Sequence, residues 1–366
     1  MNKHARNIAL FPAAVAAAVA ATLIALVGMA SCSNESIFAS IESEVKLKDP
    51  SITGTVTNVA VFNGNTYAAN GRLMRKLGTG RDWERMELPA GVSRCAEVAS
   101  SGGALFGLFQ DADWSNNSLM RFDGTTWATV ATGTRVIGIR NGSGSIYAFR
   151  EDTADYTQEN IDAEYSVVTI SGTSVGSILA SGLTSRPTAA SGGYFATTTA
   201  VYNGGSALPT TGDAPTAGIR GIAVDGGILY AATSGYVHSY TGGAWTRFPH
   251  DVNGPVTGLA WLKNGTKNVL LIAGNEGYGE VVLDGSDAPV VFQWPGEAAT
   301  SSISTDARKE YKTNVEDYNT SLITVVEDGT VVPAGDAYVL YLGVIDKDYD
   351  GLWGYYQTTQ PVWNRE

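Results

Sequence analysis

The feature that most constrains the fold is a repeated unit of four short apolar or alternating runs, each bounded by glycine or asparagine. Period-two alternation between turn residues is typical of β-strands joined in hairpins. A recurring unit of this kind predicts a supersecondary module repeated along the chain. The first clear copy comprises residues 56–64, 65–69, 72–76 and 83–87, the second comprises residues 219–227, 228–232, 236–240 and 242–248, and partial copies occur at 103–107 with 119–127 and at 136–142 with 146–148.

One residue in the second run of each unit marks the interval of the repeat, and we call it the ruler residue of that unit. Successive ruler positions are 39, 41, 48, 35, 41 and 69 residues apart, and four-stranded propeller blades recur about every 40 to 50 residues. The sequence therefore predicts an all-β fold, a β-propeller of four-stranded blades, with seven blades favoured and six or eight as alternatives. The last interval exceeds one blade and predicts an insertion near residues 302–318, with room for a short helix. The ruler positions are Tyr67, Phe106, Tyr147, Phe195, Tyr230, Leu271 and Leu340.

Stacking explains why such a unit forms a ring. A single twisted sheet cannot bury both of its faces, whereas blades arranged around an axis cover one another. Tryptophans near the fourth run would fill the wider outer space between blades, as core residues rather than as sugar-stacking platforms. We expect the ring to be closed by strands from both chain ends, residues 51–53 and 361–364. The tryptophans concerned are Trp83, Trp127, Trp245, Trp294 and Trp363.

Parts of the repeat are similar to known propellers. Residues 229–236 and 240–245 resemble repeats of sensor-type and kelch-like propellers. Residues 121–127 resemble in part the Asp-box of sialidase-like propellers, Ser-x-Asp-x-Gly-x-Thr-Trp, although the leading serine is absent. The Asp-box is a structural hairpin in that family, so these resemblances imply a fold and no activity.

The first 32 residues form a targeting segment. A positive start at Lys3 and Arg6 precedes an almost purely apolar stretch over residues 8–27, and small residues then lead to Cys32. This order is typical of a secretory signal, although the apolar run is also long enough for a transmembrane anchor. The box Met29-Ala30-Ser31-Cys32 resembles the bacterial lipoprotein signal, which reads roughly Leu-Ala-Gly/Ser-Cys.

The lipoprotein resemblance implies cleavage before Cys32, attachment of lipid to its sulfur, and acylation of the new amine, for example with palmitate. Several acyl chains on one residue suffice for stable membrane anchoring. The resemblance implies a location in the bacterial cell envelope, and Ser33 favours the outer membrane over the inner where two membranes are present. The expected domains are a signal peptide over residues 1–31, a lipidated tether over 32–51 that includes a short helix as an option, and the propeller over 52–366.

Composition excludes several function classes. The formal net charge of −12 and the lack of a dense basic patch argue against a nucleic-acid partner. Only three histidines occur, which argues against imidazole-based zinc sites and against most histidine-based catalysis. Two of them, His238 and His250, are expected in a strand and in a turn. Cys95 is expected to be a small buried hydrophobic residue.

The sharpest local motif is Asp346-Lys347-Asp348-Tyr349-Asp350-Gly351. Carboxylates at positions one, three and five, with glycine at six and the backbone carbonyl of Leu352 at seven, are similar to calcium loops of EF-hand and dockerin modules and of integrin-type propellers. Position twelve is Gln357 rather than the bidentate glutamate. The alternative is a solvated hairpin turn, since aspartate and glycine both favour turns. No cofactor is expected to be required, and structural Ca²⁺ is the one candidate.

Two function classes fit these features. The favoured one is a lipid-anchored binding or scaffold protein that uses propeller loops to engage a protein, peptide or glycan. The alternative is an extracytoplasmic carbohydrate-active enzyme, a hydrolase or lyase, with acidic residues at the mouth of the central channel. A structural envelope lipoprotein without a discrete ligand is a third option. Three or more carboxylates or arginines converging at the channel mouth would favour the enzyme, whereas an apolar or tyrosine-lined patch would favour binding.

Overall fold

The described part of the chain consists of strands, turns and loops. The computed structural model of the 366-residue chain describes residues 50–114, 116–153, 163–264, 267–275, 277–283, 289–293, 318–346 and 348–366. The chain divides into two units, Met1–Asp49 and Pro50–Glu366, and all described residues belong to the second. The expected signal peptide, Cys32, the tether up to residue 49, Trp294 and residues 302–317 of the expected insertion lie outside the described residues. Within the described residues no helix is long and apolar enough to cross a membrane.

Twenty-eight strands form seven four-stranded antiparallel sheets, and each sheet uses four strands that are consecutive in the chain. Blade 1 contains β1 (Asn58–Phe62), β2 (Asn65–Ala69), β3 (Leu73–Leu77) and β4 (Trp83–Arg85); blade 2 contains β5 (Arg94–Ser101), β6 (Ala104–Gln110), β7 (Asn117–Phe122) and β8 (Trp127–Thr129); blade 3 contains β9 (Arg135–Asn141), β10 (Ile146–Thr153), β11 (Glu164–Ser171) and β12 (Ser174–Leu183); and blade 4 contains β13 (Pro187–Ser191), β14 (Tyr194–Thr197), β15 (Val201–Asn203) and β16 (Ser206–Ala207). Blade 5 contains β17 (Gly221–Asp225), β18 (Ile228–Thr233), β19 (Tyr236–Thr241) and β20 (Ala244–Pro249); blade 6 contains β21 (Gly258–Asn264), β22 (Lys267–Gly274), β23 (Gly277–Leu283) and β24 (Pro289–Gln293); and blade 7 contains β25 (Thr320–Val326), β26 (Val339–Val344), β27 (Gly351–Tyr356) and β28 (Gln360–Arg365).

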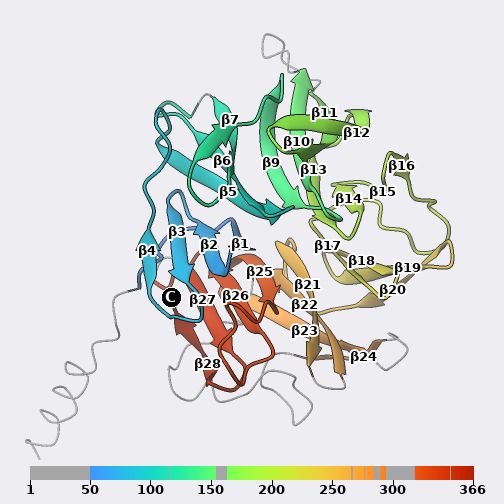
Figure 1. The fold of residues 1–366 in the computed structure, drawn as a ribbon. Helices are drawn as coiled ribbons and strands as arrows, with labels where there is room; N and C mark the ends of the chain where they lie inside the picture. Colours follow the sequence, from blue (N-terminus) through green and yellow to red (C-terminus); the bar gives the residue numbers. More distant parts are fainter. Residues whose placement is uncertain are drawn as a thin grey trace, which may run out of the picture. The chain divides into compact units, whose positions relative to one another are not determined.

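The blades follow one another around a ring (Figure 1). The first strand of each blade packs beside the first strand of the next, and β25 of blade 7 packs beside β1 of blade 1, which closes the circle. The predicted all-β propeller is therefore confirmed, with the favoured count of seven blades. All seven ruler residues lie in the second strands of their blades, from Tyr67 in β2 to Leu340 in β26.

Glycine determines the tight turns between strands. The turn between β17 and β18 consists only of Gly226 and Gly227, with φ angles of 55° and 89°. Asn63 and Gly64 make the equivalent turn in blade 1, with φ angles of 49° and 68°. Positive φ at both central residues is the type I′ geometry that matches the twist of a two-residue hairpin, and Asn and Gly adopt it most readily. The glycine-rich composition thus follows from the number of hairpins.

Seven hydrophobic clusters make up the core, and each lies at one interface between neighbouring blades. Adjacent side chains of a strand point to opposite faces of its sheet, so one strand serves two interfaces. In β2, for example, Tyr67 packs against blade 2 and Ala68 packs against blade 7. The core is therefore a ring of thin layers.

The outer tryptophans pack into these interfaces, as predicted. Trp83, Trp245 and Trp363 lie in the fourth strands of their blades and are at most 7% exposed. Trp127 begins β8 and stacks on Phe122 at a ring-centroid distance of 4.9 Å. Their burial confirms that these four side chains are core residues.

Ring closure differs from the expectation that strands from both chain ends would combine. Residues 361–364 do lie in an outer strand, β28, but residues 51–53 form no strand. Blade 7 already draws all four strands from residues 320–365, so its sheet is complete without the front segment. Ile52 is instead buried in the core between blades 7 and 1, and its N–H donates to the Glu366 carbonyl at 3.1 Å.

Candidate functional site

The register of the seven blades reveals one exceptional side chain near the ring axis. Each ruler residue pairs with a first-strand residue, and in six blades that partner is alanine or valine. In blade 3 the partner of Tyr147 is Arg140. Small side chains suit the crowded inner ring, so a long cationic side chain at this level is an exception. The six small residues are Ala60, Ala99, Ala190, Ala223, Ala260 and Val325.

Arg140 lines a cavity of about 350 Å³ at the end of the ring where the first strands begin, which we call the start face. Arg186 and Arg220 line the same cavity, and each directly precedes the first strand of its blade. A second cavity of about 230 Å³ shares Arg140 and Arg220 with the first and continues along the axis. The first cavity is also lined by Glu97, Ile137, Gly138, Phe149, Pro187, Thr188, Thr198, Thr257 and Ser321.

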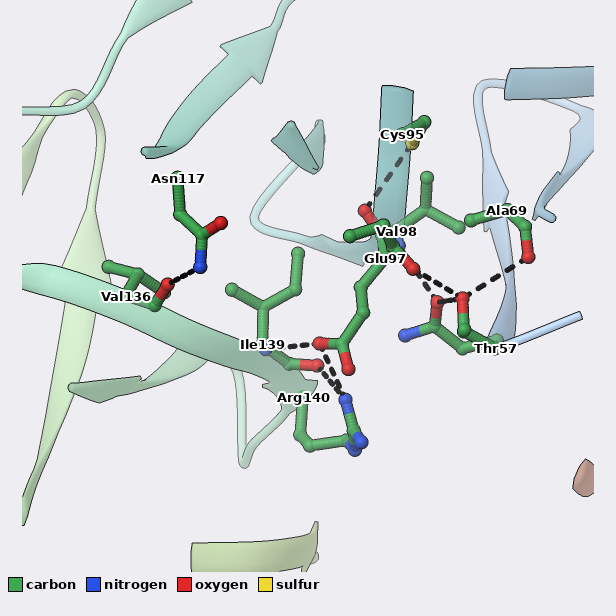
Figure 2. A network of polar contacts seen from close by, with 11 residues as sticks. Thr57, Ala69, Cys95, Glu97, Val98, Asn117, Val136, Ile139 and Arg140 are labelled. Carbon is green, nitrogen blue, oxygen red and sulfur yellow. Dashed lines mark hydrogen bonds and ion pairs between the residues drawn. The ribbon is translucent and has the colours of Figure 1, made fainter. Parts of the chain in front are cut away.

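Glu97 is the acidic residue of this cavity, and it is held by blade 3. Its Oε2 accepts hydrogen bonds from the Ile139 backbone N–H at 2.6 Å and from Arg140 Nη1 at 2.8 Å (Figure 2). The Arg140 Nη1 also donates to the Ile139 carbonyl at 2.7 Å. The pairing of β5 with β6 shifts register between Cys95 and Glu97, and a bulge of this kind re-aims the side chain that follows it.

Arg186 and Arg220 differ from Arg140 because both are exposed and, within the described residues, neither guanidinium has a hydrogen-bond or ion-pair partner. Guanidinium groups keep their positive charge at any ordinary pH. Three arginines and one glutamate therefore leave the opening with a net charge of about +2, although the whole chain carries −12. A concave site lined by one sign of charge concentrates ions of the opposite sign.

Two hydroxyl groups around the opening donate hydrogen bonds to backbone carbonyls of neighbouring parts of the ring. Thr188 Oγ1 donates to the Ile219 carbonyl of blade 5 at 2.9 Å, and Ser321 Oγ donates to the Val56 carbonyl at 2.6 Å. A hydroxyl has only one proton to donate. The guanidinium groups are therefore the positively charged donors that this opening can offer to an anion.

The comparisons with known proteins fit this architecture. A sequence model of the TP013X lipoprotein family matches residues 5–366. The chain belongs to the TP013X lipoprotein family. It is 29% identical to one uncharacterized lipoprotein of Treponema pallidum (strain Nichols), over 92% of this chain and 95% of that protein, and 26% identical to another, over 92% and 94%.

One solved structure with little sequence similarity shares the fold. A crystal structure of an extracellular domain from B. thetaiotaomicron superposes with a TM-score of 0.50 and 11% identity, over 82% of the lipoprotein and 38% of that chain. The crystal structure of Saccharomyces cerevisiae Sqt1 has a TM-score of 0.46 and 9% identity, over 81% of the lipoprotein and 94% of that chain. The first likeness shows the fold alone.

The predicted calcium loop of the lipoprotein lies between β26 and β27. Asp350 Oδ2 accepts from the Gly54 N–H at 2.9 Å, and Oδ1 accepts from Arg365 Nη2 at 2.9 Å. The carbonyl of Leu352, the expected seventh ligand, accepts from the Glu366 N–H at 2.8 Å. Within the described residues, which include Asp346 and Asp348, no group of three or more acidic, histidine or cysteine side chains could hold a metal. The loop joins the two ends of the propeller, and calcium binding stays a prediction.

The other polar candidates in the lipoprotein have structural partners. His238 Nδ1 lies 2.6 Å from the Asp213 carbonyl, His250 Nε2 lies 2.9 Å from the Thr233 carbonyl, and burial lowers the pKa of both imidazoles. Glu151 forms an ion pair with Arg135 at 3.2 Å. Cys95 is fully buried, and burial raises the pKa of its thiol, which confirms its expected role as a small core residue.

Sequence reasoning missed Arg140, Arg186, Arg220 and Glu97. These residues are far apart in the sequence and belong to no motif, so no local pattern marks them. Aligning the repeats on the ruler residues would have revealed Arg140, because that position is alanine or valine in the other blades. Arg186 and Arg220 would have appeared as two basic residues at equivalent strand starts.

Proposed function

We propose that this lipoprotein is a lipid-anchored binding protein of the bacterial envelope that takes an anionic group of its partner into the arginine-lined opening. The observation that carries the proposal is a pair of guanidinium groups, Arg186 and Arg220, which have no polar partner among the described residues and line one cavity with Arg140. Arginine forms paired hydrogen bonds to carboxylate, sulfate and phosphate groups. The partner is then a glycan, peptide or protein that presents such a group.

The surface around the opening supports a macromolecular partner. Loops between second and third strands lie on the start face, because consecutive antiparallel strands alternate in direction. Four of the six large exposed hydrophobic residues among the described residues lie in these loops or at the first residue of a third strand: Trp114, Tyr236, Ile345 and Tyr349. Arg94 packs over Trp114 at 4.4 Å and Arg247 over Tyr236 at 4.6 Å. Trp, Tyr and Arg are the residues that contribute most at binding surfaces.

The enzyme alternative rests on the same arginines, since three of them converge at the channel mouth. A carbohydrate hydrolase needs a pair of carboxyl groups flanking the bond that it breaks. Of the described residues, only Glu97 supplies a carboxylate to the cavity, and its Oε2 is already bonded to Ile139 and Arg140. Binding is therefore the better supported function. New reducing ends or new double bonds in an acidic polysaccharide incubated with the protein would instead support a hydrolase or lyase.

The anchoring step of the proposal concerns Cys32. Membership of the lipoprotein family supports lipid anchoring, and we place the lipid on Cys32, after cleavage at residue 31, with the outer membrane as the favoured location where two membranes exist. Mass spectrometry of the amino-terminal peptide should show an acylated Cys32. A Cys32→Ser variant should lose partition into a detergent phase, and unchanged partition would contradict this assignment.

The binding proposal is tested by calorimetric titration of the full-length protein, in a nonionic detergent, with sulfate and with inorganic phosphate. Arg186→Gln and Arg220→Gln should each weaken binding roughly 10- to 100-fold, since hydrogen bonds to charged groups contribute about 1.5–3 kcal/mol. Arg85→Gln is the matched control, because Arg85 is an exposed arginine of the outer strand β4. Equal affinities in all three variants, or no binding by the unmodified protein, would contradict the proposal.

A further inference from the structure

We propose that Glu97 is an internal counter-anion that withholds Arg140 from the ligand, so that the opening selects a dianion held by Arg186 and Arg220. This inference rests on the proposed function and specifies the charge of the group that is bound. It assigns to Glu97 a role in specificity rather than in holding the ring together.

Blade 1, which precedes the blade of Glu97, shows which kind of hydrogen-bond acceptor the backbone of the next blade requires at this position. Asn58 of β1 and Glu97 of β5 occupy equivalent register positions. Each lies two residues before the first-strand residue that pairs with the ruler residue of its blade. Asn58 Oδ1 accepts from the Val98 N–H of blade 2 at 2.8 Å, as Glu97 Oε2 accepts from the Ile139 N–H of blade 3 at 2.6 Å. Val98 and Ile139 are themselves equivalent in the register of their blades.

In blade 1 a neutral amide oxygen therefore accepts the equivalent inter-blade hydrogen bond. This bond does not require the negative charge of Glu97. The charge instead faces Arg140, whose Nη1 lies 2.8 Å from the same oxygen atom. Arg140 is the one residue of its ring level that is not a small aliphatic residue. The two unusual residues of the inner ring thus neutralise each other across the interface of blades 2 and 3.

This arrangement fixes the charge that the opening accepts. Two positive charges stay available at Arg186 and Arg220, and both side chains line the cavity that Arg140 and Glu97 also line. A dianionic oxyanion, such as a sulfate or phosphate group, matches that charge. A third negative charge on the ligand would face the Glu97 carboxylate, and like charges at close range in a partly dry site are unfavourable.

The test compares sulfate, a dianion, with citrate at pH 8, a trianion, on the full-length protein in detergent. Glu97→Gln keeps an oxygen acceptor for the Ile139 N–H and removes the charge. We expect this variant to bind citrate at least about tenfold more tightly than the unmodified protein does, since releasing a guanidinium adds a charged hydrogen bond. The gain for sulfate should be less than about threefold. Equal affinities of the two proteins for citrate would overturn the counter-anion role.

Two further variants separate charge from structure. The double variant Glu97→Gln/Arg140→Gln removes both charges of the pair, so it should bind sulfate within about twofold of the unmodified protein, in which Arg140 is withheld, and it should lack the citrate gain of Glu97→Gln. Asn58→Asp keeps the acceptor for the Val98 N–H and adds a negative charge to the channel, so it should weaken sulfate binding. A large sulfate loss in the double variant Glu97→Gln/Arg140→Gln would overturn the inference while leaving the proposed function intact. Absence of sulfate binding in every protein would instead overturn the proposed function.

Discussion

The interface between blades 7 and 1 differs sharply from the interface between blades 3 and 4. Among the described residues, the cluster between blades 7 and 1 contains fourteen buried hydrophobic residues, whereas the cluster between blades 3 and 4 contains five. The first interface also contains a buried lysine, Lys76, within a network of polar contacts. Both interfaces join two four-stranded sheets of the same ring, so the blade architecture alone does not require this difference.

The polar group at the 7–1 interface surrounds Lys76, which is fully buried. Its ammonium group lies over the rings of Trp83, Tyr341 and Tyr356 at 5.6, 5.0 and 5.0 Å, and it donates to both tyrosine hydroxyls. Glu366 completes the group, since Oε1 accepts from the Tyr356 hydroxyl at 2.8 Å and Oε2 accepts from Trp83 Nε1 at 2.6 Å. Each buried polar atom in this chain of contacts has a partner.

Chain connectivity is one difference between these two interfaces, although it does not set the size of a cluster, because the directly linked blades 6 and 7 share a cluster of thirteen buried residues in the described part of the chain. The polypeptide runs directly from each blade to the next at six interfaces, but blades 7 and 1 are linked only through the whole ring. Bringing distant chain segments together costs conformational entropy that grows with the length of the loop being closed. The closing interface offsets this cost with more buried surface and a specific polar group. The 3–4 interface is held by the covalent chain as well as by its smaller cluster.

The largest expected effect comes from removing an aromatic ring at the closure. Trp83→Ala should lower the free energy of unfolding by roughly 3–5 kcal/mol, because it opens a cavity and removes the donor to Glu366 Oε2. Phe195→Ala, at a fully buried residue of the 3–4 interface, should cost less because its neighbours can collapse into the space. Urea denaturation compares the two variants. An equal or larger loss in Phe195→Ala would remove the proposed distinction between the interfaces.

A smaller effect concerns pH. Burial, opposed by the Glu366 carboxylate and assisted by Arg81, lowers the pKa of Lys76 to about 8. The unfolded lysine has an ordinary pKa near 10.5, so between pH 8 and 10.5 the unfolded chain binds more protons and stability rises with pH. Above pH 10 the raised pKa of Tyr341 and Tyr356 reverses the trend, because the unfolded tyrosines ionise first.

The free energy of unfolding should therefore increase by about 2 kcal/mol between pH 8 and 10 and then decrease. Lys76→Met should abolish the increase, because methionine fills similar space without a titrating group. Denaturant titrations of both proteins at several pH values provide the measurement. A flat profile for the unmodified protein would contradict a lowered pKa of Lys76.

The smallest effect is expected at the loop that ties residue 54 to β27. Asp350→Ala removes the hydrogen bond from Gly54 and the ion pair with Arg365, which is partly exposed, so stability should fall by about 1 kcal/mol. Melting the unmodified protein with calcium and with EGTA tests the calcium loop separately. An EGTA-sensitive melting temperature supports calcium binding, and identical melts contradict it.

Much of the fold follows from local pattern. Two-residue turns such as Gly226-Gly227, and the alternation in runs such as residues 228–233, act between neighbours in the sequence, so the ruler residues identified every second strand. The arginine cluster could not be predicted in this way. Arg140, Arg186 and Arg220 are dozens of residues apart and become neighbours only because their blades stack around one axis.

The sequence by itself determined a β-propeller of four-stranded blades, with seven favoured over six or eight, together with its packed tryptophans and the buried Cys95, because strand periodicity, turn chemistry and burial of large apolar groups are local or additive properties. Only the tertiary structure decided how the ring closes, which carboxylate faces which guanidinium, and that Asp350 pairs with Arg365. Such choices depend on which side chains meet across an interface, and ring closure brings together residues that are remote in the chain.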